Sequence, residues 1–184
     1  MGIPVINIGP WTSSSTSSQE DRLAVAREVS KACQDIGFFA VTNHGVNPVT
    51  MDQAWKASQD FFDLPMTEKM AWKTANEAEY PYGYEQSERL VRGKDASVTA
   101  ETGETPADLK ETFSIGPYNP DSGMSPRRWL TTTGAPPDFR TALEEYYEAM
   151  ERLALTLLRI FAVGLGLEES WFESKMSHHL SALR

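Results

Sequence analysis

The sequence predicts an α+β fold, in which several helices accompany a few short strands. Two long stretches, Gln19 to Ile36 and Asp138 to Val163, carry apolar residues every three or four positions, which is the period of an amphipathic helix. Short β-branched or aromatic runs bounded by Gly, Pro or Asn predict the strands. An all-helical bundle is the alternative, because helical patterns cover more of the chain than strand patterns do.

The first strand is predicted at Pro4 to Ile8. Ser17 and Glu20 have the spacing of a capping box at the start of the first long helix, and Gly37 offers a stop at its end. The single cysteine, Cys33, falls within this helix. Because cysteine is often buried and no second cysteine can form a disulfide with it, we expect a small core residue.

The run Phe38 to Thr42 predicts a buried strand, which enters a turn at Asn43-His44-Gly45. Asn47-Pro48 then supplies a cap and a proline suited to the first turn of a helix, and Leu64-Pro65 ends that helix. Its buried face is predicted to carry Met51, Trp55, Ser58 and Phe62.

The second half of the chain predicts short strands at Tyr82 to Glu85 and at Lys110 to Ile115. The second long helix opens at Pro136-Pro137 and ends in the Gly164 to Gly166 region, and a short helix follows at Glu168 to Lys175. We interpret the apolar stripe of the long helix as core packing; it consists of Phe139, Leu143, Tyr146, Met150, Leu153, Leu157 and Phe161.

Composition excludes several classes of partner. Seventeen Lys and Arg against twenty-six Asp and Glu give a formal charge of -9, which repels a phosphate backbone. The N-terminus lacks a basic, apolar leader, and no stretch approaches the roughly 18 apolar residues of a membrane span. We therefore expect no nucleic acid, no membrane and a cytoplasmic location.

Six motifs follow one another along the chain: PVINI at 4–8, GFFAVTNHGV at 37–46, FFDLPMTEKM at 61–70, YGY at 82–84, KETFSIG at 110–116 and GLGL at 164–167. In this order they resemble the N-terminal region of the isopenicillin N synthase-like, 2-oxoglutarate and Fe(II)-dependent non-haem oxygenases. The resemblance implies a non-haem dioxygenase N-terminal domain over residues 1–184, with helices and strands flanking an incomplete double-stranded β-helix (jelly-roll) core. The catalytic C-terminal jelly-roll half would be absent from this sequence.

The resemblance also implies a function, that of an oxidoreductase which uses Fe(II) and 2-oxoglutarate to oxidise a small organic substrate. Isopenicillin N synthase itself uses no 2-oxoglutarate, so the iron is the firmer of the two expectations. The family binds its iron through a His-x-Asp pair and a distant second His, and no His-x-Asp occurs in this sequence. We therefore expect neither cofactor to bind this chain alone, and we expect the missing C-terminal half as its partner.

Two further interpretations stay open. The chain could be a non-catalytic binding or assembly module with an oxygenase-like N-terminal fold, or a fragment without function of its own. A gene fragment, a split reading frame or a deliberately shortened piece would each explain the missing motif. The coding DNA that follows the last codon discriminates among them.

The resemblance points to three substrate-binding candidates, Tyr84, Arg89 and Arg92, in the stretch where family members often grip their substrate. Two arginines would suit an acidic substrate. The alternative is that both are solvated loop charges.

The three histidines suggest no metal site. His44 lies in the predicted turn, where a role in local hydrogen bonding or packing is expected. His178 and His179 are adjacent, so their side chains diverge on a helix or a strand and make a poor chelating pair. No residue is assigned as catalytic or as a metal ligand.

Overall fold

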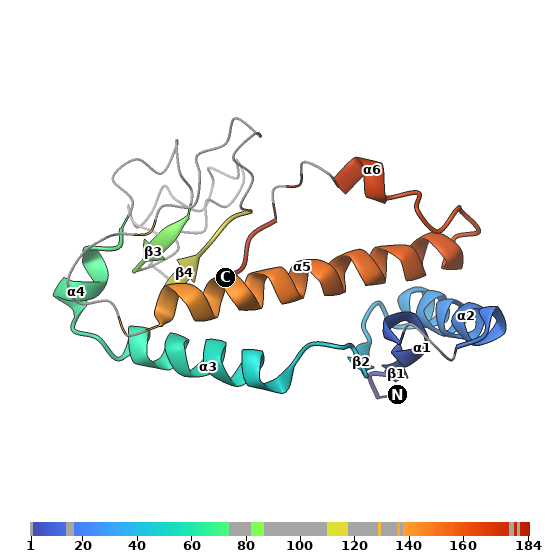
Figure 1. Ribbon diagram of the computed structural model, residues 1–184, viewed down its shortest axis with the longest axis horizontal. Helices are drawn as coiled ribbons and strands as arrows, with labels where there is room; N and C mark the ends of the chain where they lie inside the picture. Colours follow the sequence, from blue (N-terminus) through green and yellow to red (C-terminus); the bar gives the residue numbers. More distant parts are fainter. Residues whose placement is uncertain are drawn as a thin grey trace, which may run out of the picture. The chain divides into compact units, whose positions relative to one another are not determined.

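The computed structural model describes residues 2–13, 17–73, 82–86, 110–117, 129, 136, 138–176, 179 and 181–184. Both helices and strands occur, which confirms the α+β prediction and excludes the all-helical bundle (Figure 1). Contacts divide the chain into two compact units. Unit 1 comprises Met1–Lys56 with Arg140–His179, and unit 2 comprises Ala57–Phe139 with Leu180–Arg184.

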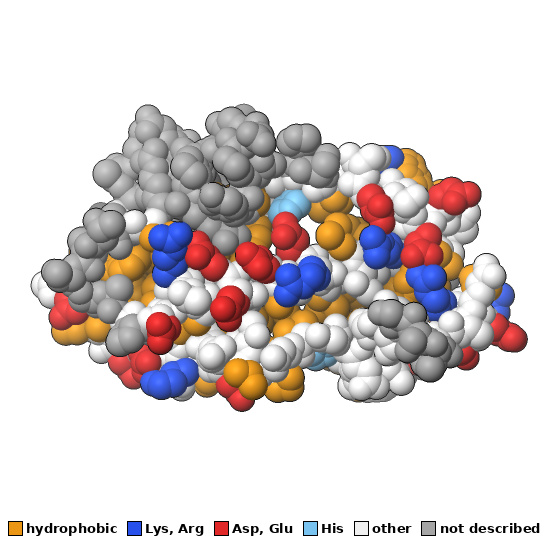
Figure 2. Space-filling view, viewed as in Figure 1, with side chains coloured by type: hydrophobic (Ala, Val, Ile, Leu, Met, Phe, Trp, Pro, Cys, Tyr) orange, Lys and Arg blue, Asp and Glu red, His pale blue; other side chains and the backbone are white. Residues whose placement is uncertain are grey.

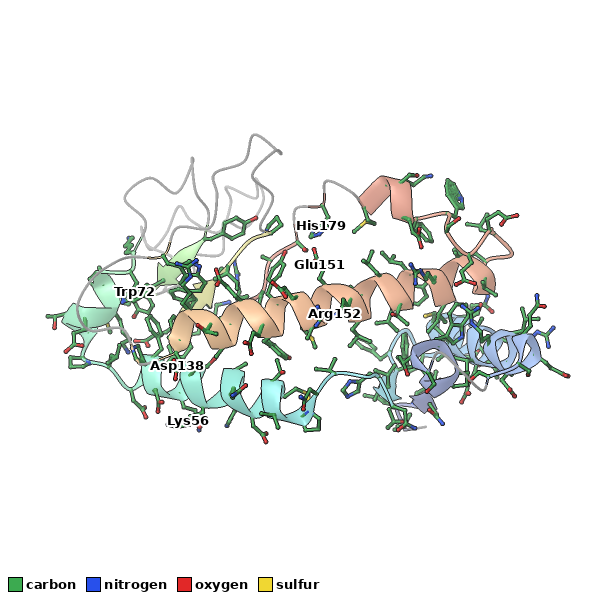
Figure 3. All side chains as sticks on the ribbon, viewed as in Figure 1. Lys56, Trp72, Asp138, Glu151, Arg152 and His179 are labelled. Carbon is green, nitrogen blue, oxygen red and sulfur yellow. The ribbon has the colours of Figure 1, made fainter. Side chains whose placement is uncertain are left out.

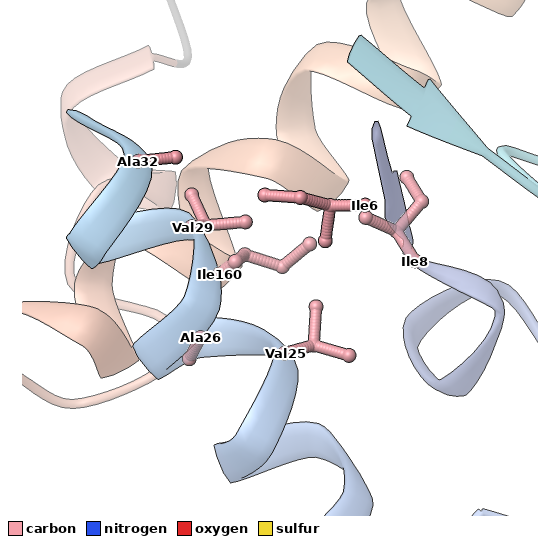
Figure 4. Close-up of a cluster of buried hydrophobic side chains, with 7 residues drawn as sticks. All are labelled: Ile6, Ile8, Val25, Ala26, Val29, Ala32 and Ile160. Carbon is pink, nitrogen blue, oxygen red and sulfur yellow. The ribbon is translucent and has the colours of Figure 1, made fainter. Parts of the chain in front are cut away.

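Unit 1 begins with a two-stranded parallel sheet in which β1 (Val5–Asn7) pairs with β2 (Ala40–Thr42). Between the strands come α1 (Gly9–Thr12) and α2 (Gln19–Asp35), and α5 (Phe139–Gly164) supplies the other long helix. Alternation along the strand turns the side chain of Ile6 inward. The buried cluster in Figure 4 joins the sheet to both helices through Ile6, Ile8, Val25, Ala26, Val29, Ala32 and Ile160.

The capping box of α2 lies one residue later than predicted. Ser18 Oγ accepts a hydrogen bond from the backbone N–H of Asp21 at 3.1 Å, and the Asp21 carboxylate accepts one from the backbone N–H of Ser18 at 3.0 Å. The predicted pair, Ser17 and Glu20, is therefore wrong. The side-chain hydrogen bond from Ser18, and then the backbone one, hold the pKa of Asp21 below its ordinary value.

The periodicity of the first long helix predicts an apolar stripe of Val25, Val29, Ala32 and Ile36. Ile36 and two other residues expected in the interior of unit 1, Cys33 and Phe38, lie at its surface. Cys33 is exposed, Ile36 is 38% exposed and Phe38 is 70% exposed. The inward face of α2 is complete at Ala32, and Ile36 already has a non-helical φ of -126°, so neither Cys33 nor Ile36 continues the stripe. Phe38 precedes β2 and, like Val5, lies at the surface of the sheet region.

The helix α3 (Pro48–Phe62) begins and ends close to its predicted limits. Asn47 Oδ1 accepts a hydrogen bond from the backbone N–H of Val49 at 3.0 Å, as the predicted cap requires. Its buried face is shifted by one residue, because Trp55 is 69% exposed and the interior positions are Ala54, Ala57 and Phe61. Small alanines occupy two of these positions, and the large aromatic ring is left outside.

The helix α5 confirms the predicted stripe, since Phe139 and Leu143 are buried and the other members are at least half-buried. It ends in a Schellman motif at Gly166, whose φ is +72°. The N–H of Leu167 donates to the carbonyl of Ala162 at 2.9 Å, and the N–H of Gly166 donates to that of Val163 at 3.0 Å. The following helix, α6 (Glu173–Met176), is shorter than the predicted Glu168 to Lys175.

Unit 2 contains α4 (Met66–Met70) and an antiparallel pair of strands, β3 (Gly83–Glu85) and β4 (Thr112–Ser114). Both strands fall within their predicted ranges. The core of the unit is aromatic and centres on Phe61, which stacks on Phe139 at 4.7 Å between ring centroids. Edge-to-face contacts to the same ring, at 4.9 to 5.9 Å, come from Phe113, Trp72 and Tyr84.

Candidate functional site

A buried lysine organises the polar part of unit 2. Lys69, on α4, is 6% exposed. Its Nζ donates to the carbonyl oxygen of Phe62, the last residue of α3, at 2.9 Å and to Glu111 Oε2 at 2.7 Å. The last carbonyls of a helix have no partner within the helix and carry partial negative charge, so an ammonium group suits this place. The ion pair with Glu111 offsets the cost of burying the charge.

Tyr84, the first substrate-binding candidate, lies beside this pair. Its side chain is buried, and its hydroxyl donates to the sulfur of Met66 at 3.4 Å. Burial, followed by the hydrogen bond and the charge of Glu111, raises the pKa of Tyr84 to about 12. The phenol is therefore neutral at ordinary pH and acts as a hydrogen-bond donor.

The backbone of Tyr84 fixes the strand against the turn that follows α4, because its N–H donates to the carbonyl of Trp72 at 3.2 Å. The ring is part of the aromatic core described above. Arg89 and Arg92 lie outside the described residues, so the structure places one of the three predicted substrate-binding residues and tests none of them as a ligand contact.

His44 has the role that the sequence predicts for it. Its Nδ1 accepts a hydrogen bond from the backbone N–H of Val46 at 3.2 Å. On either side, Asn43 and Gly45 have φ values of 53° and 77°, which Asn and Gly tolerate better than other residues. The imidazole thus belongs to a tight turn after β2.

His179 lies against α5, where its Nε2 is 2.6 Å from Glu151 Oε1 (Figure 3). Three-quarters or more of its side chain is buried, so the ring packs on the helix as well as pairing with the carboxylate. His178 lies outside the described residues.

Residues 3–132 match the family described as "non-haem dioxygenase in morphine synthesis N-terminal". The chain belongs to this family. The resemblance inferred from the six motifs is thereby confirmed.

Relatives of this dioxygenase N-terminal family cover nearly the whole chain. A 2-oxoglutarate-Fe(II) type oxidoreductase, ppzC, of Metarhizium majus is 36% identical over 96% of this chain and 48% of its own length. Jasmonate-induced oxygenase 3 of Arabidopsis thaliana is 32% identical over 91% of this chain and 40% of its own. The chain therefore spans about half the length, or less, of the curated relatives it matches.

A solved structure supports the fold. A full-length protein of Neurospora crassa, crystallised in complex with alpha-KG, superposes with a TM-score of 0.73 and 22% identity over 94% of this chain and 50% of that chain. Such neighbours are 2OG-Fe(II) oxygenases with a jelly-roll core. In the described part of the chain, the two small sheets, each with two strands, agree with an incomplete core of that kind.

The described residues do not fit the iron that the names of these relatives imply. A facial iron site needs two imidazoles and a carboxylate on one side of the metal. Among the residues that the structure describes, no group of three or more His, Cys, Asp or Glu could hold a metal ion. His44 is engaged in its turn and His179 with Glu151. That the chain alone binds neither iron nor 2-oxoglutarate stays a prediction.

Charges on the molecular surface are mixed. On the face drawn in Figure 2, Lys and Arg side chains are interspersed with Asp and Glu. Two ion pairs within α5, Arg140–Glu144 and Arg152–Glu148, also join opposite charges. Within the described part of the chain, no helix is both long and apolar enough to cross a membrane. The absence of a nucleic-acid partner and the cytoplasmic location stay predictions.

Sequence reasoning missed Lys69 and Glu111, which are 42 positions apart. One signal was present in the strand Lys110 to Ile115. Alternation places Glu111, Phe113 and Ile115 on one face of that strand, and a carboxylate among two apolar side chains on an inward face requires a buried partner.

Proposed function

We propose that this chain is the N-terminal portion of a non-haem Fe(II), 2-oxoglutarate-dependent oxygenase that oxidises a small organic substrate. The observation that carries the proposal is the match of nearly the whole chain to half of a 2-oxoglutarate-Fe(II) type oxidoreductase. Residues 1–184 would form the N-terminal domain, and a C-terminal jelly-roll half outside this sequence would hold the iron and 2-oxoglutarate.

In this proposal the present chain contributes to substrate recognition rather than to the iron site. Arg89 and Arg92 would bind an acidic substrate through charge-assisted hydrogen bonds. Tyr84 lies in β3, shortly before the stretch that contains Arg89 and Arg92, and its buried, neutral phenol supports the proposal by anchoring that strand.

The test is turnover of 2-oxoglutarate. We expect a longer protein, extended by the residues encoded after Arg184, to release succinate when Fe(II), 2-oxoglutarate and oxygen are supplied. We expect the present chain alone to release none. Succinate released by the present chain alone, or iron that stays bound to it during dialysis, would refute the proposal that the iron and 2-oxoglutarate are held by a C-terminal half outside this sequence. A longer protein that stays inactive with bound iron would favour the binding-module interpretation.

The arginines need a separate experiment with a matched control. A panel of small carboxylic acids is screened for compounds that stimulate succinate release by the longer protein. Replacing Arg89 and Arg92 together by alanine is expected to abolish the stimulation and to spare the basal rate. Arg27→Ala, on the exposed side of α2, should change neither rate. Unchanged stimulation in the double variant would show that neither arginine binds the substrate and that both are solvated charges.

A further inference from the structure

One methionine of unit 2 has a fixed polar partner. Met66, the first residue of α4, is 39% exposed, and its sulfur accepts the hydrogen bond from the buried Tyr84 hydroxyl at 3.4 Å. Met70, the last residue of the same helix, is also 39% exposed. The Tyr84 hydrogen bond therefore distinguishes two methionines that are alike in exposure.

A partly exposed thioether is open to a two-electron oxidant such as hydrogen peroxide. A sulfur lone pair attacks one peroxide oxygen, and the S–O bond forms as the O–O bond breaks. The displaced hydroxide removes the proton from the transferred oxygen and leaves as water, so the sulfur is oxidised and the peroxide is reduced. The sulfoxide is polar and chiral, and a separate reductase for each epimer restores the thioether.

The two lone pairs of the Met66 sulfur differ in their surroundings. The Tyr84 hydroxyl approaches from the interior of unit 2 and engages the lone pair on that side, since Tyr84 is only 2% exposed. The other lone pair is left for an oxidant that arrives from solvent. Attack through one lone pair or the other gives opposite epimers. We propose that Met66 is a reversible oxidation site, which hydrogen peroxide converts to a single sulfoxide epimer.

Oxidation of Met66 also acts on β3. Two links hold Tyr84 to α4 and the turn after it, namely the hydroxyl bond to Met66 and the bond from the Tyr84 N–H to the Trp72 carbonyl at 3.2 Å. Oxidation withdraws electron density from the sulfur and so weakens the first link. Glu111 stays beside the phenol, so the buried donor keeps a partner. The expected result is a looser β3 in a folded unit 2.

The state of Met66 thereby reaches the stretch after β3 that contains Arg89 and Arg92. This connection to substrate recognition rests on the proposed function, whereas the oxidation itself does not. Both experiments below use the present chain. A longer protein that releases no succinate would refute the proposed function and leave their results unaffected.

The first experiment is peroxide oxidation of the present chain, followed by trypsin digestion and mass spectrometry. Cleavage after Lys69 places Met66 and Met70 in different peptides. Each sulfoxide peptide is treated with the reductase for one epimer or for the other. We expect the two epimers of Met66 sulfoxide in a ratio of about 10 or more, the factor that a hydrogen bond of ordinary net strength supplies. Equal amounts of the two epimers would overturn the proposal.

Tyr84→Phe is the matched variant, because it keeps the ring and removes the hydroxyl. We expect the epimer ratio of Met66 sulfoxide to fall towards one, and the ratio of Met70 sulfoxide to stay as it is in the unmodified chain. A Met66 ratio that persists in this variant would contradict the role given to the Tyr84 hydroxyl.

The second experiment is amide hydrogen exchange before and after oxidation. We expect the Tyr84 amide to exchange about 3-fold faster or more in the oxidised chain, and the matching reductase to restore the original rate. Met66→Leu should abolish the acceleration. An unchanged rate in the oxidised chain, or equal acceleration in the Met66→Leu variant, would overturn the effect on β3.

Discussion

Ionisation of Tyr84 offers a direct check of the polar network in unit 2. Its pKa is raised from an ordinary value of 10.0 to about 12, so the unfolded chain loses the phenolic proton before the folded chain does. The contribution of this group to stability is therefore complete below pH 10 and is lost as the pH rises from 10 towards 12. At about 1.4 kcal/mol for each pKa unit, the full loss is about 2.8 kcal/mol.

The assay is a spectrophotometric titration of tyrosine ionisation, in which the Tyr84→Phe variant is subtracted from the unmodified chain. The difference curve isolates one phenol and should have its midpoint near pH 12. Phenylalanine keeps the ring in the aromatic core, so the variant should fold. Glu111→Gln removes the neighbouring charge and should move the midpoint down without restoring the ordinary value, because burial is the larger cause. A midpoint near pH 10 in the unmodified chain would refute the buried, hydrogen-bonded phenol.

The other predictions concern stability, measured by urea unfolding at one fixed protein concentration. Lys69→Met should lower the free energy of unfolding by about 3 kcal/mol, because it leaves the Glu111 carboxylate without its ion-pair partner. The double variant Lys69→Met with Glu111→Gln should recover much of that loss. If the losses of the two single variants simply add in the double variant, the two side chains are not coupled. Gly164→Val should cost about 2 kcal/mol, since a Cβ at this position would lie 3.0 Å from the Ala26 carbonyl oxygen. Gly164→Ala meets the same contact and should cost less, because alanine favours the helix more than valine does; an alanine variant that gains the full ~1 kcal/mol expected for replacing a helical glycine would contradict this contact. Ser18→Ala should cost about 1 kcal/mol through loss of the cap, and an unchanged midpoint would show that the cap contributes nothing.

Much of the fold could be predicted because it depends on local signals. The periodic stripe of α5, the Gly166 end and the Asn47 cap each lie within a few residues of the feature they determine. Errors of one position arose where two similar residues compete. Ser17 and Ser18 both suit an N-cap, and the choice is made by the Asp21 carboxylate that reaches back.

Burial was harder to predict than helix or strand, because it depends on which neighbours the fold supplies. Trp55 is the larger apolar residue, yet the inward positions of α3 belong to Ala54 and Ala57. Cys33 was assigned to the core from residue type alone, and Phe38 was assigned there as the first residue of a run predicted to form a buried strand.

In the candidate site too, contacts between residues close in sequence could be predicted, and contacts between distant residues could not. His44 was predictable from its turn, because the contact it makes is two residues away. The Lys69–Glu111 pair joins elements that are distant in sequence, and only the pairing of β3 with β4 brings the carboxylate to the lysine. The only local indication was the carboxylate of Glu111 on the same strand face as the apolar side chains of Phe113 and Ile115.

The placement of the tryptophans gives the two units different optical signatures. Trp72 and Trp129 lie among the rings of Phe113 and Phe139, so their near-ultraviolet circular dichroism should depend on the fixed packing of unit 2. In unit 1, the Arg22 guanidinium lies 3.9 Å from the Trp11 ring centroid. Trp55 is largely exposed to solvent, so its fluorescence emission should change little when unit 1 unfolds. Variants that keep one tryptophan at a time could therefore follow the melting of each unit separately.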